Sequence, residues 1–435
     1  MSSTISKQEV PSIPPKIGQR FKLTVYCVAI VGGLLFGYNT GIIAGAIPYI
    51  SAYFNLEGWA LGWAVGCMLI GCAVGSLIAG VLADKFGRSK ILIACAVFFV
   101  VTGLAAIVSQ QLYAFTWSRI IGGLGVGAIA LLSPLYLSEL APPSLKGTLI
   151  ASYQSAIITG ILLAYFSCSS LYGTGPNNWS WMLASQLAFP VLFGLLVYRL
   201  PEMPYDAVKG IVVSTKHDGK VFFKMEPIPF KDLFSPPYSQ LLFIGILVAV
   251  CQQVTGINVV LYYAPLIFKE LGADAAVAFR QTIFIGVITL AAAVVIIFVA
   301  DKMNRKNVML CGISLMGGLL AILAVCFRNG YVFGSFLFLL LYVAAFSCTL
   351  GTVTWLYLTE IFPGIIRGRA MSIAILALWL ADFAVSASFP AMNKYMGMPV
   401  TLLCYLTICI IFTLLIYIKV QETKDHSAGG TSKPV

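Results

Sequence analysis

The sequence predicts an all-helical membrane protein with twelve transmembrane helices in two six-helix bundles. Its 435 residues are 60% apolar and only 10% charged, whereas about a quarter of the residues in a soluble domain are charged. Two short phrases also occur twice, about half a chain apart: residues 83–88 return as 300–305, and residues 137–142 return as 358–363. Repeated halves are typical of membrane carriers that hold their cargo between the halves.

Twelve apolar runs are long enough to cross a bilayer, which takes about 20 residues. The runs are continuous rather than alternating, which argues against a membrane β-barrel. We expect two halves, 22–200 and 240–420, a middle loop at 201–239, and tails at 1–21 and 421–435. The predicted spans are 22–48, 60–83, 90–109, 112–138, 149–171, 179–200, 240–266, 276–300, 307–327, 331–358, 369–390 and 397–419.

The distribution of basic residues predicts the orientation, because cytoplasmic loops carry an excess of Lys and Arg. Most of the 27 basic residues fall in the tails, the middle loop and the turns on the same side. We therefore expect a multi-pass protein of the plasma membrane with both termini in the cytoplasm. The net charge of +11 is explained by anionic lipid, so no nucleic-acid partner is inferred.

Nothing in the sequence indicates an enzyme, a metal site or a cofactor. All 11 cysteines lie in the apolar runs, and the two histidines are isolated in polar segments. Their spacing matches neither a disulfide framework nor a metal site. No nucleophile, base and acid stand in a recognisable set, and no obligate protein partner is inferred.

The repeated phrases place acids and bases at the cytoplasmic ends of the spans. Single exposed ion pairs contribute little, so a gate would need a network at the interface between the halves. The alternative is that these basic residues only reflect the general excess of Lys and Arg in cytoplasmic loops. That excess does not explain why the acids and bases have the same spacing in both halves. Within this set we expect Glu139 to pair with Lys146, and Glu360 with Arg367. The predicted gating residues are Asp84, Arg88, Glu139 and Lys146 in the first half, and Asp301, Arg305, Glu360 and Arg367 in the second.

The seventh run carries the best candidates for cargo binding. Gln252, Gln253 and Asn258 are three amides in one apolar stretch. Amides both donate and accept hydrogen bonds, which suits a neutral, hydroxyl-rich cargo. Gln154 and Trp355 offer another amide and a ring face. The alternative role for these amides is hydrogen bonding between helices, which is common in membranes.

Ionisable groups within apolar spans usually face a cavity or a partner, because they are costly in lipid. Four such groups lie within or close to the spans: Arg119, Glu139, Glu360 and Asp382.

With these residues in place, the chain resembles the sugar porter family of the major facilitator superfamily, and in particular its facilitative hexose transporters. The likeness implies the major facilitator fold and a hexose-type cargo held by Gln154, Gln252, Gln253, Asn258 and Trp355. It also implies that Tyr262 and Tyr263 belong to an exterior gate. The phrases that carry it are 32–41, Asp84 with Arg88, Arg119 with its glycines, 134–139, 252–258 and 360–363.

Position 39 bears on the mechanism. Proton-coupled proteins that resemble this chain carry Asp there, working with the arginine of span four, whereas facilitative glucose transporters carry Asn. Here the residue is Asn39, and an amide does not take up and release a proton near neutral pH. The resemblance therefore implies a uniporter driven by the sugar gradient alone.

Departures from the family pattern leave the exact sugar and the coupling open. Asp382 and Thr289, which we also predict to bind the cargo, stand where similar proteins usually have Asn. Thr352 and Thr354 replace two prolines, so a milder break in span ten is expected. The alternatives are proton symport through the Asp382 carboxylate, a carrier of a polyol, inositol or pentose, and a sugar sensor. Sensors of this build tend to have long cytoplasmic tails, and the tails here are short.

Overall fold

The computed structural model describes residues 19–140, 145–175, 177–199 and 229–423. Every regular element in these ranges is a helix, which confirms the all-helical prediction. The tails and most of the middle loop lie outside the described residues, so the predicted domain boundaries stay a prediction.

The first six apolar runs form the helices that we call the first half. The sixth run is divided by a short 3-10 turn, η2 (Ser185–Leu187), into α6 and α7. The helices are α1 (Gln19–Tyr53), α2 (Gly58–Phe86), α3 (Arg88–Val108), α4 (Leu112–Leu140), α5 (Lys146–Ser170), α6 (Asn178–Ala184) and α7 (Ala188–Tyr198).

The remaining runs form the second half, which is preceded by η3 (Phe230–Phe234). A further 3-10 turn, η4 (Ala300–Lys302), follows α11. The helices are α9 (Tyr238–Val254), α10 (Ile257–Glu270), α11 (Ala275–Val299), α12 (Arg305–Arg328), α13 (Val332–Cys348), α14 (Leu350–Ile361) and α15 (Gly364–Lys419).

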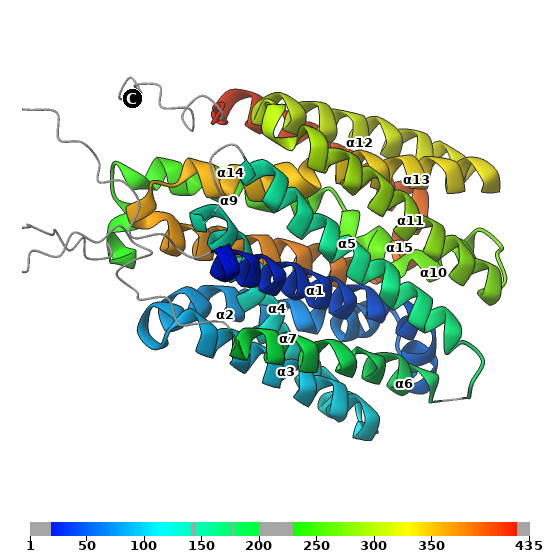
Figure 1. Cartoon of the computed structure of the whole chain (residues 1–435). Coiled ribbons are helices and arrows are strands. Elements are labelled where there is room, and N and C mark those ends of the chain that lie inside the picture. Colours follow the sequence, from blue (N-terminus) through cyan, green and yellow to red (C-terminus); the bar gives the residue numbers. More distant parts are fainter. Residues whose placement is uncertain (1–18, 141–144, 176, 200–228, 424–435) are drawn as a thin grey trace, which may run out of the picture.

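Eleven helical stretches of the described chain are long and apolar enough to cross a membrane. One of them, α15, has 56 residues, which at about 1.5 Å per residue is far longer than the ~30 Å hydrocarbon core. Its helix is broken at Gly397, where φ is 78°. Because α15 thus supplies two spans, the predicted total of twelve is confirmed. Accordingly, α1 begins and α15 ends at the same end of the bundle (Figure 1).

Two spans of the second half are broken near their middle. The seventh is interrupted at Gly256, where φ is 89°, a left-handed conformation that favours glycine. The tenth is interrupted at Thr349, before the two threonines that replace prolines. Span ten is thus divided into α13 and α14 at one residue, and the expectation of a milder break than usual stays a prediction.

Glycines bring α2 and α4 into close contact. A Cβ atom added to Gly71 would collide with the backbone oxygen of Ile120, and one added to Gly123 would collide with that of Met68. Small residues allow this approach of membrane helices. The glycines of spans two and four therefore serve helix packing.

The halves meet along two helix pairs. Helix α2 packs against α15, and α5 packs against α11; in Figure 1, α5 runs between α1 and α11. Contacts between the halves occur at both ends of the bundle. We call these the Asp301 end, where Asp301 meets Thr148, and the Lys394 end, where Lys394 meets Glu57.

Candidate functional site

A cavity of about 60 Å³, the central cavity, lies between the halves. Helices α1 and α5 line it from one side, and α9, α10, α11, α13, α14 and α15 line it from the other. All the predicted cargo residues except Asp382 contribute to its wall: Gln154, Gln252, Gln253, Asn258, Thr289 and Trp355. Residues from both halves of the sequence thus converge on one space.

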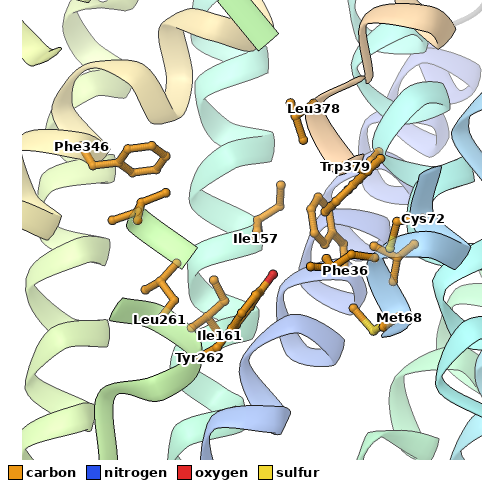
Figure 2. Packing of buried hydrophobic residues seen from close by; sticks show 14 of the residues in the cluster. Phe36, Met68, Cys72, Ile157, Ile161, Leu261, Tyr262, Phe346, Leu378 and Trp379 are labelled. Atoms are coloured by element: carbon orange, nitrogen blue, oxygen red, sulfur yellow. The ribbon is translucent and has the colours of Figure 1, made fainter. Parts of the chain in front are cut away.

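Much of the cavity wall is apolar. Phe36 of α1 and Trp379 of α15 lie against each other across the halves, with ring centroids 5.6 Å apart (Figure 2). Ile157 of the first half and Leu261 and Phe346 of the second also line the cavity. This wall offers ring and aliphatic faces to whatever the cavity holds.

The three amides of the seventh span form a hydrogen-bonded chain. Asn258 Nδ2 donates to Gln253 Oε1 at 2.8 Å, and Gln253 Nε2 donates to Gln252 Oε1 at 3.2 Å. Gln252 Nε2 in turn donates to the backbone oxygens of Leu350 at 3.1 Å and Gly351 at 3.4 Å. Gln252 therefore bonds another helix, at the start of α14. Such bonding between helices was the alternative role that the sequence left open for these amides.

Asp382 is buried one layer behind the cavity wall, with 1% of its surface exposed. Its Oδ2 accepts hydrogen bonds from Asn258 Nδ2 at 2.7 Å and Tyr262 OH at 3.2 Å. Its Oδ1 accepts one from Ser386 Oγ at 2.9 Å. The carboxylate is therefore connected to the cavity through two of the residues that line it, Asn258 and Tyr262.

Several buried polar atoms at the cavity have no hydrogen-bond partner in the structure: Thr40 Oγ1, Gln154 Oε1, Ser347 Oγ and Trp379 Nε1. Buried polar groups are normally paired, and each unpaired group costs about 1–3 kcal/mol. A polar ligand in the cavity would supply the missing partners.

Thr40, Ser347 and Trp379 were not identified as site residues from the sequence. Two signals were available. Thr40 directly follows Asn39 in the sequence. Trp379 precedes Asp382 by three residues, which places Trp379 and Asp382 on one face of a helix. Nothing in the sequence around Ser347 distinguishes it from the other small polar residues of the spans.

Asn39 and Arg119 lie together inside the first half, away from the central cavity wall. Both are buried, with 0% and 1% of their surfaces exposed. Arg119 Nη1 donates to Asn39 Oδ1 at 3.2 Å, and Asn39 Nδ2 donates to Gln186 Oε1. The amide at position 39 is thus held by partners on two sides, and Gln186 is a further member of this group that the sequence did not reveal.

The two adjacent tyrosines of α10 face different spaces. Tyr262 lines the central cavity. Tyr263 lines a second cavity, at the Lys394 end, and its hydroxyl donates to the backbone oxygen of Ser386 at 2.8 Å. The pair therefore lies between the two cavities, and its role in an exterior gate stays a prediction.

At the Asp301 end, a carboxylate of the second half binds the start of a helix in the first half. Asp301 accepts hydrogen bonds from the backbone nitrogens of Gly147 at 2.7 Å and Thr148 at 3.0 Å, and from Thr148 Oγ1 at 2.6 Å. Lys146 Nζ crosses in the same region to the backbone oxygen of Thr359 at 3.2 Å. Negative charge at a helix N-terminus is favourable, so these contacts hold the halves together.

Other gating residues also have contacts inside their own half. Arg305 forms an ion pair with Glu360 at 3.0 Å, whereas the sequence paired Glu360 with Arg367. Arg367 Nε donates to the backbone oxygen of Phe362 at 3.2 Å. The guanidinium of Arg88 lies 4.5 Å from the ring centroid of Tyr136. The side chains of Asp84 and Glu139 lie outside the described residues.

Comparison with known proteins places these features in context. The family described as "Sugar (and other) transporter" matches residues 25–429. The arabinose-proton symporter of Bacillus subtilis is 33% identical over 439 residues, with 95% of each chain covered. The glucose facilitated diffusion protein of Zymomonas mobilis is 31% identical over 452 residues, covering 92% of this chain and 94% of the relative.

The solved structures include a similar fold. A proton:xylose symporter of the major facilitator superfamily, bound to 6-bromo-6-deoxy-D-glucose, superimposes with a TM-score of 0.78 at 32% identity. The match covers 93% of this chain and 97% of the symporter. The predicted major facilitator fold is confirmed by this likeness.

Proposed function

The chain belongs to the sugar porter family of the major facilitator superfamily, and we propose that it moves a hexose, glucose foremost, by facilitated diffusion. Members of the family are membrane transporters rather than enzymes. Alternating exposure of a site between two halves is how such carriers work.

The unpaired polar atoms of the central cavity are the observation that carries the cargo proposal. Gln154 Oε1, Trp379 Nε1 and the hydroxyls of Thr40 and Ser347 face a space between the halves without partners. A sugar presents hydroxyl groups that both donate and accept, and a C–H face that packs on rings such as Trp355. The polar groups of this wall are neutral, which suits an uncharged cargo with many hydroxyl groups.

Asn39 supports uniport. Its amide oxygen accepts from Arg119 and its nitrogen donates to Gln186, so the position works as a fixed hydrogen-bonding group. A carboxylate there would exchange a proton when Arg119 moved; the amide does not. The energy for transport then comes from the sugar gradient alone.

Proton symport through Asp382 is the second candidate, because the Asp382 carboxylate is buried and bonded to Asn258, a residue of the cavity wall. Proton binding at Asp382 would change the bonds that Asn258 offers to the cargo. Similar proteins include both an arabinose-proton symporter and a glucose facilitator. Pentoses, polyols and inositol are accordingly the alternative cargoes.

We place the Asp301 end in the cytoplasm and the Lys394 end outside, in the plasma membrane. The excess of basic residues at the loops of the Asp301 end supports this orientation. Both termini are then cytoplasmic.

The test uses the full chain in liposomes with radiolabelled D-glucose. Uptake should reach the outside concentration and stop, with or without an imposed proton gradient. Unlabelled fructose, galactose, xylose, arabinose and inositol compete in parallel to rank the cargoes. Accumulation above the outside level only under a proton gradient would refute uniport, and its loss in Asp382→Asn would identify the coupling group. Absence of glucose uptake would refute the hexose proposal, and absence of uptake of the other sugars as well, each supplied in labelled form, would refute the carrier proposal.

A further inference from the structure

The cavity at the Lys394 end is larger than the central one. Its volume is about 360 Å³, within the ~300–1,000 Å³ typical of small-molecule sites, whereas the central cavity has about 60 Å³. Its walls come from α2 of the first half and from α10 and α15 of the second. In this arrangement of the halves, the space of ligand size is therefore at the mouth of the carrier.

Polar groups surround this cavity, and one of them lacks a partner. Asn393 Nδ2 donates to Glu270 Oε2 at 2.9 Å, but Asn393 Oδ1 is buried without a hydrogen bond. Lys394 and Glu57 form an ion pair of 2.6 Å across the halves. Amide, carboxylate and ammonium groups thus lie around one space and offer both donors and acceptors.

The inner wall of the same cavity is aromatic. The rings of Tyr263 and Phe389 lie 5.0 Å apart, and both residues line the cavity. Tyr262, the neighbour of Tyr263, lines the central cavity instead. One pair of adjacent residues therefore separates the two cavities along the same route between the halves.

We propose that the Lys394-end cavity is a second sugar-binding site, which holds a monosaccharide before it enters the central cavity. This inference rests on the proposed function, since it takes the same cargo. The Asn393 oxygen and the Glu270 carboxylate would accept from sugar hydroxyls, and the Phe389 and Tyr263 rings would pack on its C–H face. Binding there is weaker than in the central cavity, because Glu57 and Lys394 are 74% and 49% exposed and stay hydrated.

The proposal predicts two sugar molecules per carrier at saturation. Equilibrium binding of radiolabelled D-glucose to the purified full chain should give a tighter and a weaker component. Gln252→Ala should weaken the tighter component about tenfold or more and leave the weaker one unchanged. Asn393→Ala should weaken the second component about tenfold, the equivalent of one lost hydrogen bond to a buried group, and leave the first unchanged.

Matched variants keep the test decisive. Asn329→Ala removes another amide at the same end, whose Nδ2 donates to the Val325 oxygen of the preceding helix α12 and which lies outside the cavity wall. This variant should change neither component. Glu270→Ala serves where Asn393→Ala fails to fold, as judged by thermal unfolding. A single component that Gln252→Ala weakens would refute the second site while the carrier proposal stands, and so would a weak component unaffected by both cavity variants. No binding to the wild-type chain would refute the proposed function itself.

Discussion

The hydroxyl of Tyr165 on α5 donates a 2.7 Å hydrogen bond to the backbone oxygen of Leu261 on α10. Pro265 lies one turn further along α10, and proline has no N–H to offer that oxygen. A side chain of the first half therefore replaces a helical hydrogen bond that the second half lacks. The contact exists only while α5 and α10 lie together, so it favours the present arrangement of the halves.

Tyr165→Phe should loosen the contact between α5 and α10. Hydrogen bonds between membrane helices contribute about 1 kcal/mol. The population of the arrangement in which α5 contacts α10 should therefore fall roughly fivefold. Hydrogen exchange of residues 262–270 would measure the change. Tyr342→Phe is the matched control, because its hydroxyl donates to Thr255 within the second half. Equal exchange in both variants would show that Tyr165 does not link the halves.

Gln252→Ala and Asn258→Ala should each weaken glucose binding about tenfold or more, because each removes an amide from the central cavity wall. Equilibrium binding to the purified variants measures this. Thermal unfolding is needed alongside for Gln252→Ala, since that change also frees the Leu350 oxygen. Gln281→Ala on α11, which lies outside the cavity wall, should bind normally. Unaltered affinity in both cavity variants contradicts the cargo assignment.

Asn39→Asp should make transport depend on pH. The new carboxylate would stand 3.2 Å from Arg119 Nη1, where it could bind a proton whenever the arginine moves away. We expect glucose accumulation in liposomes under an inward proton gradient, which the wild type should lack. Asp382→Asn in the same background shows whether the second carboxylate contributes. If Asn39→Asp gives no response to the gradient, position 39 does not decide the coupling.

Asp301→Ala should open the Asp301 end. Three donors of the first half, two of them backbone nitrogens, would lose their acceptor, and the favourable charge at the start of α5 would be lost. Hydrogen exchange at residues 147–150 should rise about tenfold. Asp232→Ala, an exposed acid of η3 at the same end, is the control. Similar exchange in the two variants would show that Asp301 does not hold the two halves together at this end.

The ion pair at the Lys394 end should respond to acid. The hydrogen bond from Lys394, together with its charge, lowers the pKa of Glu57. A lowered pKa means that the pair is present above the ordinary carboxyl range and is lost as the pH falls through the lowered value. Because single exposed ion pairs contribute little, opening of this end should increase only slightly as the pH falls below the ordinary carboxyl range, measured by hydrogen exchange of residues 57–62. Glu57→Gln should show the opening at neutral pH and no further change with acid.

The number of spans and the class of protein could be predicted from the sequence, because their causes are local. In lipid, each segment must satisfy its own backbone by forming a helix, so a run such as 276–300 is sufficient to predict α11. The amides of the seventh span were identifiable for the same reason, as polar residues in an apolar stretch.

The partners of individual side chains depended on which helices pack together, and no local pattern contains that information. Asp301 binds backbone nitrogens of α5, which every residue but proline possesses, so the sequence carries no sign of the contact. Trp379 meets Phe36, and Asp382 lies behind Asn258 rather than in the cavity wall, only because α15 crosses α1 and α10 as it does. The sequence by itself therefore determined the helices and their family, and the packing of two halves decided which groups face the cargo, because burial and pairing are properties of neighbours distant along the chain.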